Sequence, residues 1–459
     1  MPARPRGRIR ERAPRPSSSP EVVFEGRGYW RGKISALEIG VDEEGIITQV
    51  GRNVRGGRRV DLGERLMLPS ALDLHVHFRD PGPPGSPESF ASGTKSAALG
   101  GISAVVDMPN TVPPTTTPER VIDKIARIQA HAQIDVIPFA ALRPDTNVAR
   151  LARVASGFKL YLAPTTGDLG VDTGTDVGEL LREAAATGLP VHVHAEDPRK
   201  FNPRDQPRET DAWDRSRPEI AEISALEKLR DHPAGMRLHV AHVTSAGAAR
   251  LARELGASSE ATPHHLLLST SLFGNSFQKV NPPLRAESTR KALWETFRDG
   301  LVPMVASDHA PHSLSLKEAP FPEAPSGMPG VETLFPLLLE TVRRGDLELS
   351  RLIHAACRNP ALHLDLPRGR LEKGCEANFL AVDFRVRRKI RAKDLSTLCG
   401  WTPFEGREAV FPLEHYLLGK RIVDDGEFVG GVRGRSLRVA PLLPKKSPHL
   451  PGSPPVRAP

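Results

Sequence analysis

The sequence predicts an α/β fold, a (β/α)8 or TIM barrel with a small flanking β-sandwich built from both ends of the chain. After residue 69, eight strand-like segments alternate with helix-like segments over about the length of one such barrel. On both sides of this stretch, short β-like runs are broken by glycines instead. Polar residues also gather at the C-terminal ends of the predicted strands, the face on which such barrels build their sites.

The predicted barrel strands are apolar segments with few charges. They read "ALDLHVHF", "ISAVVDMPN", "IDVIPFAAL", "GFKLYLAP", "PVHVHAED", "LHVAHVTS", "SSEATPHHLLL" and "VPMVASDHAPH". Between them, "TPERVIDKIARIQAHA", "DVGELLREAAATG" and "TRKALWETFRDG" have the pattern of amphipathic helices. The predicted domains are a disordered basic tail (1–20), the N-terminal half of the β-sandwich (21–68), the barrel (69–355), the C-terminal half of the β-sandwich (356–440) and a disordered Pro-rich tail (441–459).

The net charge of +8 belongs to the two tails. Residues 1–16 contribute +5 and residues 441–459 contribute +3, so the 17–440 segment is neutral. Pro-rich segments of this kind bury too little apolar surface to order themselves. We therefore expect solvated tails and no specific nucleic-acid partner.

Cysteine content and hydropathy indicate a cytoplasmic protein. Three cysteines (Cys357, Cys375 and Cys399) are too few for a disulfide framework, which favours a reducing compartment. The chain has no apolar run long enough to predict a membrane span. Its N-terminus lacks the apolar stretch of a secretory signal.

His75 and His77 stand one residue apart in "DLHVHFRDPG". Alternate side chains of a strand share a face, so both imidazoles point the same way at a strand end. Such a pair suits a divalent metal, and zinc favours nitrogen ligands. An HxH pattern alone is equally typical of structural histidines.

Lys159 stands in the apolar segment "GFKLYLAP". A buried ammonium is costly unless it is paired, and burial favours the neutral amine. A neutral amine can take up carbon dioxide to become a carbamate that bridges two cations. The alternative is a lysine that reaches solvent or forms an ion pair.

Two later strands offer further histidines. "VHVHAED" places His192 and His194 on one face, whereas the odd spacing of His239 and His242 predicts opposite faces. We favour the later residue of each pair, which lies nearer the strand end. His192 and His239 are expected to pack or to support ligands.

The eighth predicted strand carries Asp308 in "VASDHAPH". Its carboxylate could bind a metal and accept a proton. His312 follows one turn later and could reach a substrate anion. His264 and His265 are interpreted as structural.

Five motifs occur in order between about residues 65 and 425: "DLHVHFRDPG", "DMPNT", "KVNPPLR", "SDHAPH" and "CGWTPFEG". Their combination resembles the dihydroorotases of the amidohydrolase superfamily. That family has a (β/α)8 barrel with a flanking β-sandwich. The resemblance implies reversible cyclisation of N-carbamoyl-L-aspartate to (S)-dihydroorotate in pyrimidine (UMP) biosynthesis.

The resemblance also implies a centre of two zinc ions with a hydroxide between them as nucleophile. One ion would be held by His75, His77 and Asp308, the other by His194 and His242, and carboxylated Lys159 would bridge them, with Asp168 as the alternative bridge. Asp308 would accept the proton of the attacking water and deliver it to the departing ring nitrogen.

Further residues match the family's substrate contacts. The carboxylate-binding residues would be Arg79, Asn110 and His312, and additional contacts would come from Asn281, Ser326 and Gly327. A guanidinium fork suits a carboxylate because it donates two parallel hydrogen bonds. Many relatives carry phenylalanine at the position of Ser326, and asparagine in a Pro-rich turn has an ordinary role in turn formation.

Three alternatives stay open. Allantoinases and hydantoinases share the barrel and the metals, but Arg79 and Asn110 favour a substrate with a carboxylate. A non-catalytic scaffold subunit is the third, although such proteins typically lose metal ligands. Besides a small-molecule substrate, a homo-oligomer or association with aspartate transcarbamoylase is expected.

Overall fold

A computed structural model describes residues 19–442 except 84–85, 166, 203–206 and 272–273. All but the inner ends of the two predicted tails lie outside the described residues. Among the residues described, no helix is both long and apolar enough to cross a bilayer. Cys357, Cys375 and Cys399 are all buried free thiols.

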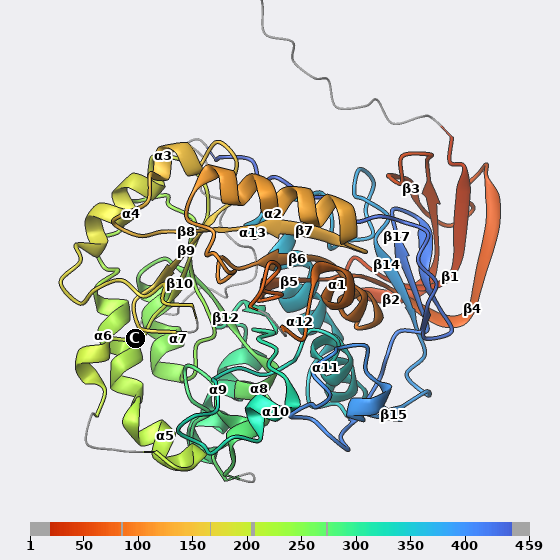
Figure 1. The fold of residues 1–459 in the computed structure, drawn as a ribbon. Helices are drawn as coiled ribbons and strands as arrows, with labels where there is room; N and C mark the ends of the chain where they lie inside the picture. Colours follow the sequence, from red (N-terminus) through yellow and green to blue (C-terminus); the bar gives the residue numbers. More distant parts are fainter. Residues whose placement is uncertain (1–18, 84–85, 166, 203–206, 272–273, 443–459) are drawn as a thin grey trace, which may run out of the picture.

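A parallel barrel forms the centre of the molecule (Figure 1). Its strands are β5 (Ala71–Val76), β6 (Ile102–Asp107), β7 (Asp135–Pro138) continued by β8 (Ala140–Ala141), β9 (Phe158–Tyr161), β10 (Val191–His194), β11 (Leu238–Val240), β12 (Ser258–Ala261) and β13 (Met304–Val305). Neighbours pair in chain order, and a parallel bridge between Val76 and His309 joins the last strand to the first. All eight predicted strands are therefore present, and the predicted fold class is confirmed.

Helices follow each strand and cover the outside of the barrel (Figure 1). They are α1 (Phe90–Leu99), α2 (Pro118–His131), α3 (Val148–Leu151), α4 (Val177–Ala185), α5 (Thr210–Ser216), α6 (Glu219–Glu227), α7 (Ala246–Glu254), α8 (Pro263–Leu267), α9 (Glu287–Arg298), α10 (Leu314–Lys317), α11 (Leu334–Arg343), α12 (Leu349–Ile353) and α13 (Asn359–His363), with single turns at Pro198–Lys200, Ser276–Gln278, His354–Arg358 and Ala392–Asp394. Local sequence explains where they begin. Thr117 caps α2 by accepting from the backbone N–H of Arg120, and Pro118 fits the first turn because its missing N–H is not needed there.

Both chain ends meet in one eight-stranded sheet beside the barrel. Its strands are β1 (Val22–Trp30), β2 (Lys33–Val41), β3 (Ile47–Gly51), β4 (Arg58–Pro69), β14 (Phe379–Val382), β17 (Glu414–Leu417), β18 (Lys420–Asp424) and β19 (Glu427–Phe428), and β15 (Arg388–Lys389) pairs separately with β16 (Glu408–Ala409). β4 pairs with β1 on one side and with β14 on the other, so it joins the two ends. In the core of this sheet the rings of Phe379 and Tyr416 stack on each other, and Phe24 packs edge-on against both.

The predicted segment 356–440 contains more than sheet. Helix α13 still packs on the barrel, and near the end of the described chain Ser436 forms a bridge with Val136 of β7. Arg435 pairs there with Asp135 at 2.7 Å. The domain boundaries themselves stay predictions.

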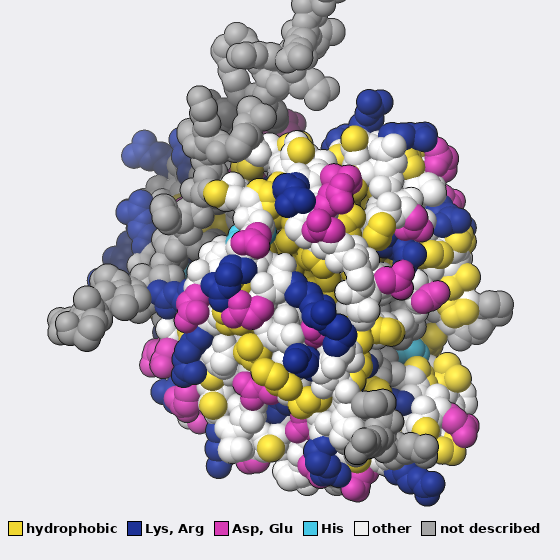
Figure 2. Space-filling model, turned by 90° about the vertical axis from the view of Figure 1, so that its left-hand side faces the viewer, with side chains coloured by type: hydrophobic (Ala, Val, Ile, Leu, Met, Phe, Trp, Pro, Cys, Tyr) yellow, Lys and Arg dark blue, Asp and Glu magenta, His cyan; other side chains and the backbone are white. Residues whose placement is uncertain are grey.

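Charges on the folded part are mixed in sign. On the face that Figure 2 shows, basic and acidic side chains are interspersed and do not gather into a large patch of one sign. This agrees with the neutral charge balance of residues 17–440.

Candidate active site

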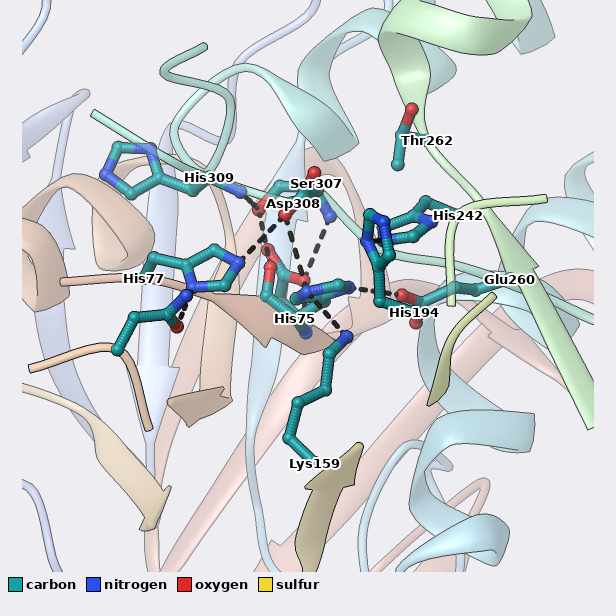
Figure 3. A network of polar contacts seen from close by, with 12 residues as sticks. His75, His77, Lys159, His194, His242, Glu260, Thr262, Ser307, Asp308 and His309 are labelled. Atoms are coloured by element: carbon teal, nitrogen blue, oxygen red, sulfur yellow. Dashed lines mark hydrogen bonds and ion pairs between the residues drawn. The ribbon is translucent and has the colours of Figure 1, made fainter. Parts of the chain in front are cut away.

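The six predicted metal ligands come together at one end of the barrel (Figure 3). His75 lies in β5 and His77 follows it; Lys159 lies in β9; His194 ends β10; His242 follows β11; Asp308 follows β13. Parallel strands place their carboxyl ends on one face, so residues far apart in sequence meet there. All six side chains are buried.

His75, His77 and Asp308 form a compact donor set. One ligand atom of each lies within 4.8 Å of the others. The same Asp308 oxygen, Oδ1, is 3.0 Å from Nε2 of His77 and 3.4 Å from Nε2 of His75. Burial is the largest cause that lowers the pKa of both imidazoles, so both are neutral near pH 7. Two neutral imidazoles and a carboxylate fit a divalent ion.

A second pair of imidazoles lies beside this set. Nδ1 of His194 is 3.0 Å from Nε2 of His242, whose ring stacks on His75 at 5.2 Å between centroids. Lys159 reaches the same place from β9, and its Nζ is 3.1 Å from Nε2 of His75 (Figure 3). Burial lowers the pKa of Lys159 to about 8, so a fraction of its amine is neutral near neutral pH.

Three site residues have left-handed backbones, which non-glycine residues rarely adopt. The φ angles are 51° at Arg79, 40° at His242 and 45° at Asp308. Such conformations cluster at functional sites because the surrounding structure must hold them.

The prediction that His239 and His242 face opposite ways is wrong. β11 ends at Val240, and the left-handed turn at His242 brings its ring back into the barrel. His239 also points inward, with its Nε2 3.0 Å from Oε2 of Glu260. Strand alternation did not apply because the strand had already ended.

Two buried acids that the sequence reasoning missed support the imidazoles. Glu260 on β12 places its Oε1 2.8 Å from Nδ1 of His75, and Glu196 places its Oε2 2.8 Å from Nε2 of His194. Carboxylates in this position select the tautomer of a metal-binding histidine and fix its ring. The available signal was a lone acid in the apolar strand segment "SSEATPHH".

A pocket opens beside these donors. Ten of the twelve predicted site residues line it: His75, His77, Arg79, Asn110, His194, His242, Asn281, Asp308, Ser326 and Gly327. Lys159 and His312 are not among the lining residues. Tyr161, Thr165, Val280 and Ala310 also line the pocket and were missed.

Arg79 and Asn281 bring unpartnered polar atoms to the pocket. Among the described residues, Nε of Arg79 and Oδ1 of Asn281 have no hydrogen-bond partner although both are buried. Arg79 is held by Nη1, which donates to the carbonyl of Pro311, and its Nη2 lies 3.3 Å from Nε2 of His312. Burial lowers the pKa of Arg79 to about 10, which leaves it charged at neutral pH.

Asn110 connects the pocket to the donor set. Its Oδ1 accepts from the hydroxyl of Tyr161 at 2.9 Å and lies 2.6 Å from Nδ1 of His77. A carbonyl oxygen only accepts, so Nδ1 of His77 carries the proton and Nε2 presents its lone pair toward Asp308. Asp168, the alternative bridge, is exposed and does not line the pocket.

The remaining predicted histidines have structural contacts. His192 contacts His363, with 3.0 Å between their Nε2 atoms. His265 contacts Thr262 and the carbonyl of Pro282.

Comparisons with known proteins agree with this geometry. Residues 66–405 match the family model described as the amidohydrolase family. A dihydroorotase from Halobacterium salinarum is 38% identical over 411 residues, covering 87% of this chain and 96% of that protein. A dihydroorotase from Methanosarcina acetivorans is 36% identical, covering 84% and 88%.

Solved structures show the same architecture. The L-hydantoinase (dihydropyrimidinase) from Arthrobacter aurescens superposes with a TM-score of 0.81 at 26% identity, covering 89% of this chain and 97% of that one. A D-hydantoinase from a Bacillus species gives a TM-score of 0.81 at 22% identity, covering 92% and 100%, and shows the fold alone.

Proposed function

This chain belongs to the amidohydrolase family, and from that premise we propose that it is a dihydroorotase. It interconverts dihydroorotate and N-carbamoyl-L-aspartate by opening and closing one cyclic amide bond, a step of pyrimidine biosynthesis. Relatives that share 32–38% identity over most of their length carry the name dihydroorotase.

One observation carries the choice of substrate. The charged guanidinium of Arg79 lines the same pocket as the metal donors His75, His77 and Asp308. Its Nε has no hydrogen-bond partner among the described residues. Dihydroorotate has a carboxylate on the ring whose amide bond is cleaved, so one molecule can satisfy both features. Hydantoin lacks that carboxylate and would leave the buried guanidinium unpaired.

We propose that the centre holds two zinc ions. His75, His77 and Asp308 would hold one and His194 and His242 the other, with a carboxylated Lys159 as the bridge. The donor set fits because the imidazoles are neutral and Glu260 and Asn110 orient two of them. Bound zinc supplies Lewis acidity and lowers the pKa of water toward about 7.

Residues of the chain itself bind the substrate and transfer the proton. Arg79, Asn110 and His312 bind the carboxylate, while Asn281, Ser326 and Gly327 contact the ring. In hydrolysis a water oxygen bonds to the amide carbon, the carbon–nitrogen bond breaks, and Asp308 carries the water's proton to the departing ring nitrogen. Cyclisation reverses these steps.

The test compares three cyclic amides on one purified sample of known metal content. We expect dihydroorotate to be hydrolysed, and carbamoyl-aspartate cyclised, at least about a hundredfold faster than hydantoin or allantoin are hydrolysed. A preference for hydantoin or allantoin would overturn the substrate assignment. A metal-loaded sample inactive on all three would favour the scaffold interpretation.

A further inference from the structure

Loop 318–327 ("EAPFPEAPSG") carries one wall of the pocket and has no helix or strand of its own. It joins α10 to Met328, and Ser326 and Gly327 at its far end line the pocket. Pro320, Pro322 and Pro325 lack backbone N–H groups, so the loop cannot satisfy many of its own carbonyl oxygens.

Lys279 fills the inside of the loop's first bend. Its Nζ donates to the carbonyl oxygens of Phe321 at 2.7 Å, Pro322 at 3.1 Å and Ala324 at 2.8 Å. The ammonium also lies 5.0 Å from the ring centre of Trp213. All three of its donors are therefore used by one short segment.

Lys317 does the same for the second bend. Its Nζ donates to the carbonyl oxygens of Pro325 at 2.9 Å, Gly327 at 3.1 Å and Lys279 at 3.3 Å. The side chain is fully buried, with the ring centre of Trp401 5.4 Å away.

Carbonyl groups, and not carboxylates, surround the two amino groups, and three carbonyl oxygens around each Nζ match the three donors of the protonated form. Burial opposes this by lowering the pKa of Lys317 to about 7 and that of Lys279 below its ordinary value. Among residues 19–442 as described, no carboxylate lies within 4.0 Å of either ammonium. Five carbonyl groups of the loop depend on the two lysines, and buried carbonyls without donors are costly. A change to a neutral side chain therefore removes what holds the loop in this conformation.

The held loop is connected to the pocket residues. The backbone N–H of Gly327 donates to the carbonyl of Lys279 at 3.0 Å, and Nε2 of His312 donates to the carbonyl of Ser326 at 3.0 Å. Gly327 has a φ of 139°, and a Cβ there would lie 2.6 Å from the carbonyl oxygen of Ala310. The loop thus fits closely against the segment that carries His312.

We propose that Lys279 and Lys317 are positioning residues whose ammonium groups hold loop 318–327 in the conformation that binds substrate. They act through the backbone of Ser326 and Gly327 and do not touch the reacting atoms. The inference rests on the proposed function for its kinetic readout, because the substrate used there is dihydroorotate.

The kinetic experiment replaces each lysine by a neutral side chain of similar length. We expect Lys317→Met and Lys279→Met to raise KM for dihydroorotate about tenfold to a hundredfold, with kcat changed much less and metal content unchanged. Lys317→Arg keeps the charge and should lie nearer the wild type. Lys291→Met, on an exposed lysine of α9, is the matched control and should change nothing.

A second readout needs no activity. Glu323 lies between Pro322 and Ala324, whose carbonyl groups Lys279 binds, so its backbone is held although its side chain is exposed. A glutamate-specific protease should cut after Glu323 slowly in the wild type and at least about tenfold faster in both methionine variants, with the site identified by mass spectrometry. A wild type inactive on every cyclic amide would refute the proposed function while this readout still tests the loop.

Unchanged KM together with unchanged cleavage after Glu323 in the methionine variants would overturn the proposal. If a methionine variant does not fold, Lys317→Arg decides: cleavage after Glu323 as slow as in the wild type supports a role for the charge. Fast cleavage in a folded, charge-retaining variant would contradict it.

Discussion

The metal donors of the pocket lie at strand ends, whereas the residues expected to bind substrate lie mainly on loops. We call the first set the donor half (His75, His77, His194, His242 and Asp308) and the second the substrate half (Arg79, Asn110, Asn281, Ser326 and Gly327). His77 and Asp308 follow adjacent strands, β5 and β13, and the backbone N–H of His77 donates to the carbonyl of His309 at 2.8 Å. The sheet ladder itself therefore sets their distance. Ser326 and Gly327 depend instead on side chains that reach into their loop. We conclude that damage to the first half should affect chemistry and metal affinity, and damage to the second should affect substrate recognition.

The largest expected effect comes from Asp308→Asn. The amide keeps one oxygen that could still bind a metal ion beside His77, but it cannot accept and return a proton, so kcat should fall about 10²- to 10⁴-fold. Steady-state rates and metal content are measured on the same sample, with the exposed Asp231→Asn as the control. A near-native kcat would contradict the proton-transfer role.

The second-largest loss of activity is expected for Arg79→Gln, and its size should depend on the substrate. Loss of the charged hydrogen bonds is expected to lower kcat/KM for dihydroorotate about a hundredfold, or about 3 kcal/mol. Any residual hydrolysis of hydantoin, which has no carboxylate, should stay within about threefold of the wild type. Equal losses on both substrates would show that Arg79 serves the donor half as well.

Glu260→Gln should lower the metal affinity of the donor half without changing substrate binding by the substrate half. The carboxyl group of Glu260, whose pKa burial raises to about 8, contacts both His75 and His239, and an amide offers only one oxygen acceptor for the two rings. We expect metal affinity to fall about 10- to 100-fold in chelator competition, with KM nearly unchanged. An unaltered affinity would mean that packing alone orients His75.

The last prediction concerns the stability of the metal-free protein, and not its activity, as a function of pH. Burial lowers the pKa of Lys159 from its ordinary value of 10.5 to about 8, so between these values the unfolded chain holds a proton that the folded chain has released. The free energy of unfolding should therefore rise with pH in this window, by up to about 1.4 kcal/mol per pH unit, and gain nothing from Lys159 below pH 8.

Urea unfolding of metal-free wild type and Lys159→Met measures this contribution. The variant should lack the rise, and Lys291→Met should keep it. If the free energy of unfolding rose equally with pH in the wild type and in Lys159→Met, the pH dependence would belong to other groups.

The sequence predicted the strand-end residues better than the loops. The patterns around His75, His77 and Asp308 locate the two strands whose carboxyl ends carry these residues, because strand periodicity is local. The strands themselves are shorter than predicted, since β5 ends at Val76 and β13 at Val305. Glu260 was missed because its partner His75 is 185 positions away, and no local pattern reports a contact across the barrel. The opposite facing predicted for His239 and His242 was wrong because strand alternation stops where the strand stops, although His242 itself lies at the site as predicted.

Side-chain chemistry and short-range periodicity specify the alternation of strands and helices and the kinds of donor atoms available, and both can be read along the chain without a fold. Three further features became known from the folded chain: which donors meet, which ring nitrogen each imidazole presents and what holds loop 318–327. These depend on the register between strands and on buried contacts such as that of Asp308 with His77, 231 positions apart, which form only when the whole barrel closes.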